Sequence, residues 1–233
     1  MTVSVPTVFV PGLASSPRLY AEQLPAAWRL GPVSVADHTR DDSMASIARR
    51  VLGTAPARFA LVGLSMGGYV AFEIMRQAPE RVTRLALLDT SARPDAIEQT
   101  AKRKELIALA QNGRFSEVPD LLFPRLVHKD HVGDEQLRGL VRLMAVETGA
   151  DAFVRQQTAI LTRPDSRPTL GAIACPTLVV VGDGDELTPP DIAREIASGV
   201  RGARLAIVPD SGHLSTLEQP GHVARLLGDW LQG

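Results

Sequence analysis

The sequence predicts an α/β protein with a mostly parallel sheet of about six strands and helices on both faces. Short apolar runs alternate with stretches of helical periodicity, which is typical of successive strand–helix–strand units. The runs are apolar throughout rather than alternately polar, as expected when helices cover both faces of a sheet. Between Leu88 and Thr177 the chain carries only helical patterns. This stretch predicts a helical insertion between two strands.

The six predicted strands are short runs rich in aliphatic residues. They are expected at Thr7–Val10, Val33–Ala36, Phe59–Val62, Leu85–Leu88, Thr177–Val181 and Arg204–Val208. Turn-forming residues follow several of them: Pro11-Gly12 after the first, Gly63 after the third and Pro209 after the last. Glycine and proline interrupt a strand pattern, so these residues indicate where the runs end.

Helices are expected between these strands, where the apolar residues recur at helical spacing. They are Tyr20–Trp28, Ser43–Leu52, Met66–Gln77, Pro189–Ser198 and Pro220–Leu231. The fourth has a marked start, because Thr188-Pro189-Pro190-Asp191 has the form of a capping box with proline at the first helical position. Thr188 is therefore expected to cap this helix.

The insertion is expected to be a helical cap. Leu137, Leu140, Val141, Met144 and Ala145 fall at i, i+3, i+4, i+7 and i+8, which is one apolar face of a helix. Because a structureless loop of this length is rare in a compact domain, further helices are expected within Ala96–Gln111, Phe115–Leu126 and Ala152–Leu161. We therefore divide the chain into a core (residues 1–90 and 168–233) and a cap (residues 91–167) that form one structural unit. The K-R-K at Lys102–Lys104 is interpreted as a solvated helix face rather than a binding patch.

The composition is that of an ordinary globular protein and excludes several classes of partner. Of 233 residues, 45% are hydrophobic and 22% are charged, and the formal net charge of −1 gives no reason to expect nucleic acid or an anionic membrane as partner. No apolar run approaches the roughly 20 residues that span a bilayer and no signal-peptide pattern is present, so a cytoplasmic location is expected. The single cysteine, Cys175, is expected to be a buried structural thiol, and no metal site is predicted.

The segment Gly63-Leu64-Ser65-Met66-Gly67 predicts a sharp turn from a strand into a helix. Glycines on both sides of the serine make room where the backbone comes too close for side chains, and such a turn leaves the serine strained and exposed. Met66 adds a backbone N–H at the N-terminus of the helix, where negative charge is stabilised. This context predicts that Ser65 is a nucleophile.

A serine hydroxyl needs a base and an orienting acid before it attacks well at neutral pH. Among the five histidines, His213 is favoured because it follows the last strand, on a loop at the carboxyl edge of the sheet. His38 also follows a strand and is the nearest competitor. His128, His131 and His222 are interpreted as solvated or local hydrogen-bonding groups.

The acid is expected in Asp183-Gly184-Asp185-Glu186, after the fifth strand. Asp185 is favoured, while Asp183 is interpreted as shaping the turn and Glu186 as a longer, solvated alternative. Asp89, at the end of the fourth strand, remains a rival because it could also approach the histidine. A turn or cap hydrogen bond is the simpler interpretation of Asp89.

In chain order, Gly-Leu-Ser-Met-Gly-Gly, Gly-Asp-Gly-Asp-Glu-Leu-Thr-Pro-Pro and Ser-Gly-His-Leu-Ser-Thr-Leu-Glu-Gln-Pro resemble the α/β-hydrolase superfamily, over essentially the whole chain. The resemblance implies an α/β-hydrolase fold with Ser65 as nucleophile, Asp185 as acid and His213 as base. It also implies an oxyanion hole of two backbone N–H groups, from Met66 and from Leu13 in the turn after the first strand. The commonest family pattern has His-Gly where this chain has Pro11-Gly12, so the support of that turn is left open.

Together these residues predict a serine hydrolase that cleaves a small or medium carboxylic ester through an acyl-enzyme on Ser65, without a metal or organic cofactor. The substrate is expected between cap and sheet, with Leu13, Leu64 and Met66 as candidate wall residues. A lactone, thioester or carbon–carbon bond hydrolase with the same triad is an alternative, and so is a non-catalytic ligand-binding member of the fold. The related menaquinone-pathway lyase usually has arginine where this chain has Tyr69, which disfavours that chemistry.

Overall fold

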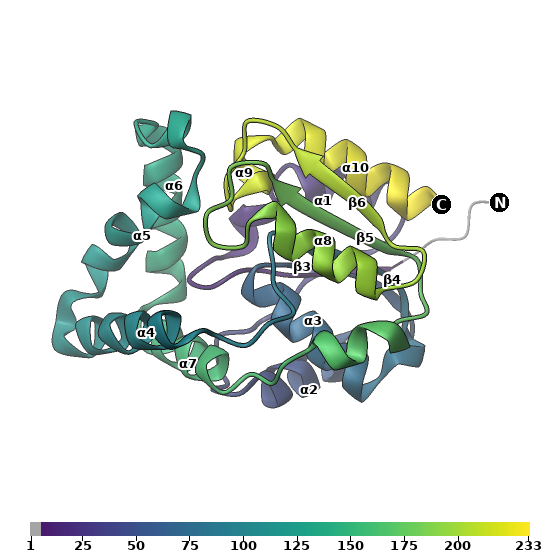
Figure 1. The fold of residues 1–233 in the computed structure, drawn as a ribbon, viewed down its shortest axis with the longest axis horizontal. Helices are drawn as coiled ribbons and strands as arrows, with labels where there is room; N and C mark the ends of the chain where they lie inside the picture. The colour runs from purple at the N-terminus through teal and green to yellow at the C-terminus, as the bar shows by residue number, and fades with distance from the viewer. Residues whose placement is uncertain (1–5) are drawn as a thin grey trace.

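A computed structural model describes residues 6–233, and its centre is a sheet of six parallel strands (Figure 1). The strands lie in the order β2-β1-β3-β4-β5-β6, and every neighbouring pair is parallel. Their bounds are β1 Thr7–Val10, β2 Val33–Val35, β3 Phe59–Leu64, β4 Val82–Leu88, β5 Thr177–Gly182 and β6 Arg204–Val208. The predicted fold class and all six predicted strands are confirmed, although β4 begins three residues earlier than expected.

The register of the sheet brings the carboxyl ends of the central strands to one edge. Val10 lies opposite Gly63, and Leu64 lies opposite Leu88. The strand order reverses between β1 and β3, because β1 pairs with β2 on one side and with β3 on the other. In open parallel sheets, ligands bind outside the carboxyl ends of the strands at such a reversal. A ligand site is therefore expected at the carboxyl ends of β1 and β3.

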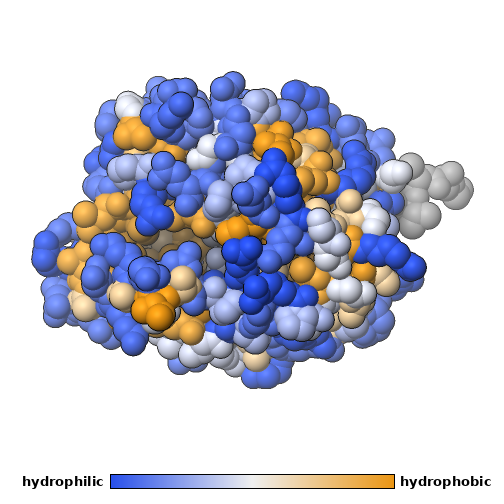
Figure 2. All heavy atoms as spheres, in the orientation of Figure 1, coloured by the Kyte–Doolittle hydropathy of each residue, from blue (hydrophilic) through white to orange (hydrophobic). Residues whose placement is uncertain are grey.

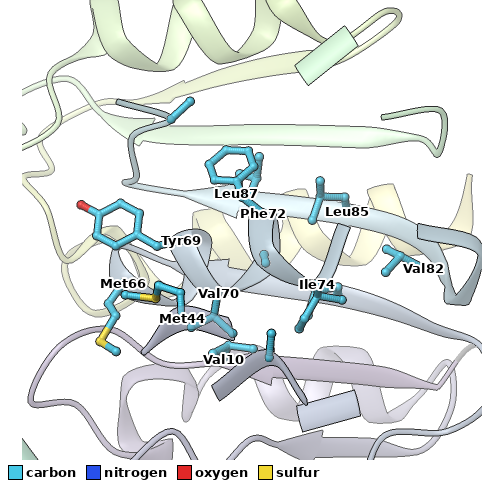
Figure 3. Packing of buried hydrophobic residues seen from close by; sticks show 14 of the residues in the cluster. Val10, Met44, Met66, Tyr69, Val70, Phe72, Ile74, Val82, Leu85 and Leu87 are labelled. Carbon is cyan, nitrogen blue, oxygen red and sulfur yellow. The ribbon is translucent and has the colours of Figure 1, made fainter. Parts of the chain in front are cut away.

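Helices α2 (Met44–Thr54), α3 (Met66–Gln77) and α8 (Pro190–Gly199) cover one face of the sheet. Figure 3 shows part of this layer, where Val70 and Ile74 of α3 pack among strand residues such as Leu85. α1 (Gln23–Trp28) and α10 (Pro220–Gln232) pack on the other face. Since successive strand residues point to opposite faces, two covered faces require the strands to be apolar throughout, and β1, β3 and β5 are buried along their whole length.

The predicted helical cap is present between β4 and β5, and in Figure 1 it stands beyond the end of the sheet to which the strand arrows point. Its helices are α4 (Ile97–Leu109), α5 (Val118–Leu126), α6 (Glu135–Thr148) and α7 (Ala150–Leu161). α6 buries Leu137, Val141, Met144 and Ala145, the apolar face that the spacing predicted. The cap therefore lies over the carboxyl edge of the sheet.

The remaining helical segments are short. They are η1 Pro17–Tyr20, η2 Pro79–Arg81, η3 Ala110–Arg114, η4 Phe115–Glu117, η5 Lys129–His131, η6 Arg167–Ala172 and α9 Ser215–Glu218. η3 is a π-type turn that continues α4, and it contains Gly113, whose φ of 75° departs from helical geometry. The boundary at residues 90/91 and 167/168 between core and cap stays a prediction.

Three local predictions need correction. The helix expected from Tyr20 begins only at Gln23, because Tyr20 ends η1 and its hydroxyl donates to the Val10 carbonyl at 2.8 Å. Thr188 does not cap α8, since Pro189 is the N-cap residue and the Thr188 hydroxyl donates to Asp185 instead. Cys175 is only half-buried, and burial raises the pKa of its thiol.

Within residues 6–233 no helix is long and apolar enough to cross a membrane. The same part of the chain contains no group of three or more His, Cys, Asp or Glu side chains that could hold a metal ion.

Candidate active site

Ser65 lies on a sharp turn between β3 and α3, with φ 54° and ψ −114°. A non-glycine residue in this region is strained by about 1–3 kcal/mol, so the surroundings must hold it there. The Ser65 N–H donates to the Leu88 carbonyl at 2.9 Å, and its carbonyl accepts from the Thr90 hydroxyl at 2.7 Å. A Cβ on Gly67 would lie 2.0 Å from the Val10 carbonyl oxygen, so only glycine allows α3 to start this close to β1.

The structure brings Ser65, His213 and Asp185 together although they come from three separate loops. Ser65 Oγ lies 2.8 Å from His213 Nε2, and His213 Nδ1 lies 2.8 Å from Asp185 Oδ2. The Nδ1–H donates to the carboxylate, which can only accept, and this leaves Nε2 free to accept from the serine hydroxyl. Asp185 is held by Leu187 N–H (2.8 Å), Thr188 N–H (2.9 Å) and the Thr188 hydroxyl (2.7 Å).

The electrostatics of this pair favour an ionised acid beside a basic histidine. Burial alone would raise the pKa of Asp185, but the charge of His213 and the hydrogen bonds from His213 and Thr188 outweigh it and lower the pKa below its usual value. Burial lowers the pKa of His213, but the charge and hydrogen bond of Asp185 outweigh this effect and raise the pKa above 6.5. An ionised Asp185 holds the imidazole in the tautomer that general-base catalysis needs.

Asp89, the rival acid, has a different position. Its Oδ1 accepts from Gly182 N–H at 3.0 Å, its Oδ2 shares a 2.5 Å hydrogen bond with the Ser215 hydroxyl, and neither oxygen bonds to His213. Burial, together with the nearby charge of Asp185, raises its pKa to about 8. At neutral pH it is therefore protonated, and a neutral acid cannot stabilise an imidazolium. The geometry favours Asp185 as the orienting acid.

The turn after β1 places Leu13 beside Ser65, and two buried side chains support it. His38 Nε2 donates to the Gly12 carbonyl at 2.9 Å, and burial lowers the pKa of His38, which keeps the ring neutral. Gln156, on cap helix α7, accepts from Ala14 N–H at 3.0 Å through Oε1. Ala14 itself has φ 52°, so the turn is tightly bent at this point. His38 is therefore a support of this turn and not a base for Ser65.

A cavity of about 160 Å³ opens above Ser65 between the cap and the sheet edge. Its wall is mostly apolar and includes Leu13, Leu64, Leu106 and Met144. Figure 2 shows a hollow bordered by hydrophobic residues on the side of the molecule where Figure 1 places the cap helices. The Met66 side chain does not line the cavity; as the first residue of α3 it packs in the core against α2 (Figure 3), which corrects its assignment to the wall.

The other candidates from the sequence lie away from the serine. Asp183 accepts from Ser211 N–H at 3.3 Å and shapes the turn, while Glu186 is exposed. His131 pairs with Glu218 at 2.8 Å, and His128 packs on the Cα of Gly184. None of them competes with His213 or Asp185 for contact with Ser65.

Comparison with known proteins identifies the family of the chain. A model described as the alpha/beta hydrolase family matches residues 7–226. The chain belongs to the alpha/beta hydrolase family. Ser65, Asp185 and His213 follow one another along the chain in the order in which nucleophile, acid and base occur in this family.

Individual relatives of this chain carry different names. BpoC of Mycobacterium tuberculosis, provisionally named a non-heme bromoperoxidase, is 30% identical over 72% of this chain, and the match spans 65% of the length of BpoC. The pimeloyl-[acyl-carrier protein] methyl ester esterase of Aromatoleum aromaticum is 27% identical over 90% of each chain. A solved structure of a thermophilic esterase from Thermogutta terrifontis matches with a TM-score of 0.89 at 27% identity, covering 98% of this chain and 89% of the other.

Sequence analysis missed two buried side chains that support this site, Gln156 and Glu218. Gln156 lies within an ordinary helical pattern that gives no sign of its role. Glu218 accepts from Gly212 N–H at 2.8 Å and from His128 N–H at 2.6 Å, and so ties the loop of His213 to the end of α5. The only sequence signal was that Glu218 follows His213 closely. Both side chains accept from backbone N–H groups that are distant in sequence, and only the fold brings these groups near.

Proposed function

We propose that this hydrolase cleaves small carboxylic esters through an acyl-enzyme on Ser65. The observation that carries the proposal is the 2.8 Å contact between Ser65 Oγ and His213 Nε2, at the base of a mostly apolar cavity. A strained serine within hydrogen-bond reach of a buried, oriented histidine is the arrangement of an activated nucleophile. Asp185 completes it by fixing the tautomer of the base.

In the proposed reaction, Ser65 Oγ attacks the ester carbonyl while His213 Nε2 takes the hydroxyl proton. The imidazolium, stabilised by Asp185, returns that proton to the leaving alkoxide as the carbon–oxygen bond breaks. Water then attacks the acyl carbon while His213 takes a proton from it, and His213 returns that proton to Ser65 Oγ as the bond to the serine breaks and the carboxylic acid leaves. Apart from the water that is consumed, each step needs only groups that the chain itself provides.

The oxyanion of each tetrahedral intermediate is expected to accept from the N–H groups of Leu13 and Met66. Met66 is the first residue of α3, where the N–H has no partner within the helix and the helix dipole favours negative charge. The chain lacks the His-Gly pattern, and the Gly12–Ala14 turn is held instead by hydrogen bonds to His38 and Gln156. Loss of one such donor would cost about 10²- to 10³-fold in turnover.

The size of the cavity supports a small substrate. Pockets for drug-sized ligands enclose about 300–1,000 Å³, whereas this one encloses about 160 Å³. Esterase names among the relatives, including the Aromatoleum and Thermogutta proteins, support ester hydrolysis over the other chemistries of the family.

A fluorophosphonate probe tests the proposal directly, because it reacts covalently with activated serines. Labelling is expected on the peptide that contains Ser65, with loss in Ser65→Ala and in His213→Ala. Ser198→Ala, which removes an exposed serine of α8, is the matched control and should label like the wild type. Folded wild-type protein that is not labelled at Ser65 would refute the enzyme assignment and favour a ligand-binding member of the fold.

The bond type is then ranked with a panel of simple esters, lactones, thioesters and β-diketones. We expect the highest kcat/KM for short esters. If a lactone, thioester or β-diketone gives the higher kcat/KM and Ser65 is labelled normally, Ser65 is supported as the nucleophile and the assignment to esters is refuted.

A further inference from the structure

The charged residues that line the active-site cavity all have the same sign. Lys102 and Arg103 of α4 and Arg125 of α5 contribute to its wall, and no Asp or Glu among the described residues does so. The whole chain carries a formal charge of −1, so this basic lining is local. A cavity with cationic walls and no anion favours a ligand that carries negative charge.

Arg103 is the most deeply placed of the three. Its side chain is 18% exposed, and its Nε donates to Asp95 at 2.6 Å. Asp95 also pairs with Arg163 at 2.8 Å, so two guanidinium groups share one buried carboxylate. The cluster keeps one uncompensated positive charge. Arg103 uses only some of its five N–H donors on Asp95 and Gln157, which leaves donors for a further acceptor.

Gln157 of α7 provides a second, independent observation. The residue is fully buried and lines the cavity, and its Oε1 accepts from Arg103 Nη1 at 2.9 Å. That contact fixes the amide orientation, and Nε2 is left without a hydrogen-bond partner. An unsatisfied buried amide is rare in native proteins and is explained when a ligand supplies the missing acceptor.

Tyr69 adds a polar group to the same wall. It lies one turn after Ser65 on α3 and lines the cavity, and in Figure 3 its hydroxyl points away from Phe72 and Leu87. Arg163 lies over its ring, 4.3 Å from the centroid. Arg103, Gln157 and Tyr69 therefore come from three helices to form one polar wall in a mostly apolar cavity.

We infer that this polar wall binds a carboxylate on the substrate, so that the enzyme acts on esters that carry a second, acidic group. The inference rests on the proposed function, in which Ser65 attacks the ester carbonyl. A carboxylate would accept from Arg103 and from Gln157 Nε2, and its charge would be balanced by the excess positive charge of the cluster. The interpretation of the K-R-K as only a solvated face is thus revised: Lys102 and Lys104 are exposed, whereas Arg103 turns inward.

The test compares substrates that differ only in charge. Monoethyl esters of succinic, glutaric and adipic acid are each paired with the ester whose free carboxylate is replaced by a carboxamide of the same shape. A second set places the carboxylate on the alcohol side, with 4-acetoxybutanoate paired with 4-acetoxybutanamide. Ethanol or acetate release gives kcat/KM for each, and the quantity measured is the ratio of acid to amide within a pair.

In the wild type the acid-to-amide ratio of kcat/KM is expected to be about 10 to 100 for at least one pair, as a charged hydrogen-bonded contact implies. Arg103→Met and Gln157→Leu should bring the ratio towards 1, because each removes donors to the carboxylate. Asp95 keeps its partner Arg163 in Arg103→Met, and Gln157→Leu removes a buried unsatisfied group, so both variants should fold. Circular dichroism and thermal unfolding check this.

Lys104→Met is the matched control, since it removes a positive charge from the neighbouring exposed residue of the same helix. It should keep the wild-type ratio. Equal or faster cleavage of the amide substrates by the wild type, or an equal loss of the ratio in Lys104→Met, would overturn the carboxylate site. In both cases cleavage of the neutral esters would leave the proposed function standing. If no ester is cleaved and Ser65 is not labelled, both the proposed function and the carboxylate site are refuted.

Discussion

Replacing Asp89 with asparagine should make the protein more stable at neutral pH and leave it active. The new side chain would keep an amide oxygen for Gly182 N–H and would offer an N–H to the Ser215 hydroxyl. Asp89 has φ 43°, a conformation that asparagine adopts more readily than most residues. The substitution therefore preserves the local hydrogen bonds while removing the ability to ionise.

The magnitude follows from the pKa of Asp89, which rises from 3.8 to about 8 on burial. At pH 7 the carboxyl is ionised in the unfolded chain but protonated in the folded protein. The pH is then about three units above the unfolded pKa, and each unit corresponds to about 1.4 kcal/mol, so ionisation favours the unfolded state by about 4 kcal/mol. This contribution is absent below pH 4, grows as the pH rises, and levels off above pH 8. Asp89→Asn removes it, because the amide does not ionise in either state.

Urea unfolding of the wild type and Asp89→Asn at several values between pH 5 and pH 8 measures the effect. The variant is expected to gain stability over the wild type with rising pH, by up to about 1.4 kcal/mol per pH unit. Its kcat/KM should remain within about threefold of the wild type. Asp185→Asn is the matched comparison and should lose about 10⁴-fold in kcat, because the wrong tautomer of His213 is then favoured. A stability difference that does not change with pH, or activity lost in Asp89→Asn and kept in Asp185→Asn, would refute the reasoning.

Three further predictions concern the same site. Because Asp185 raises the pKa of His213 and only neutral imidazole acts as a base, kcat/KM should fall as the pH drops, with a midpoint above 6.5 in a pH–rate profile. Gly67→Ala should lower kcat by about 10²-fold or more, since its Cβ would push the β1 turn away from Ser65, whereas Gly139→Ala, which meets no atom within 4 Å, should not. Gln156→Leu should destabilise the fold by about 1 kcal/mol, because the half-buried Ala14 N–H loses its acceptor, and should lower kcat more than it changes KM. Wild-type kcat in this last variant would show that the turn does not depend on α7.

The sequence alone predicted the parallel sheet, the helical cap and the turn at Ser65, because these depend on local patterns. Apolar runs, helical spacing and glycines around a serine act over a few residues, and local geometry responds to them directly. His213 could be chosen for a similar reason, since it follows a strand and all parallel strands end at the same edge. The choice between Asp185 and Asp89 stayed open, because both follow strands that end there.

Only the tertiary structure decided which side chains face one another across the site. Gln156 supports the turn of Ala14 from 142 residues away, and Arg103 and Gln157, 54 residues apart, meet in the wall of the cavity. Arg103 and Lys104 are neighbours in a run of three basic residues, yet one turns inward and the other faces solvent. Hydrogen bonds and burial require three-dimensional proximity at the scale of a few ångströms, and no spacing along a single chain contains that information. The fold class and the turn that presents Ser65 can therefore be predicted from local sequence, whereas the support and the charge of the pocket depend on tertiary packing.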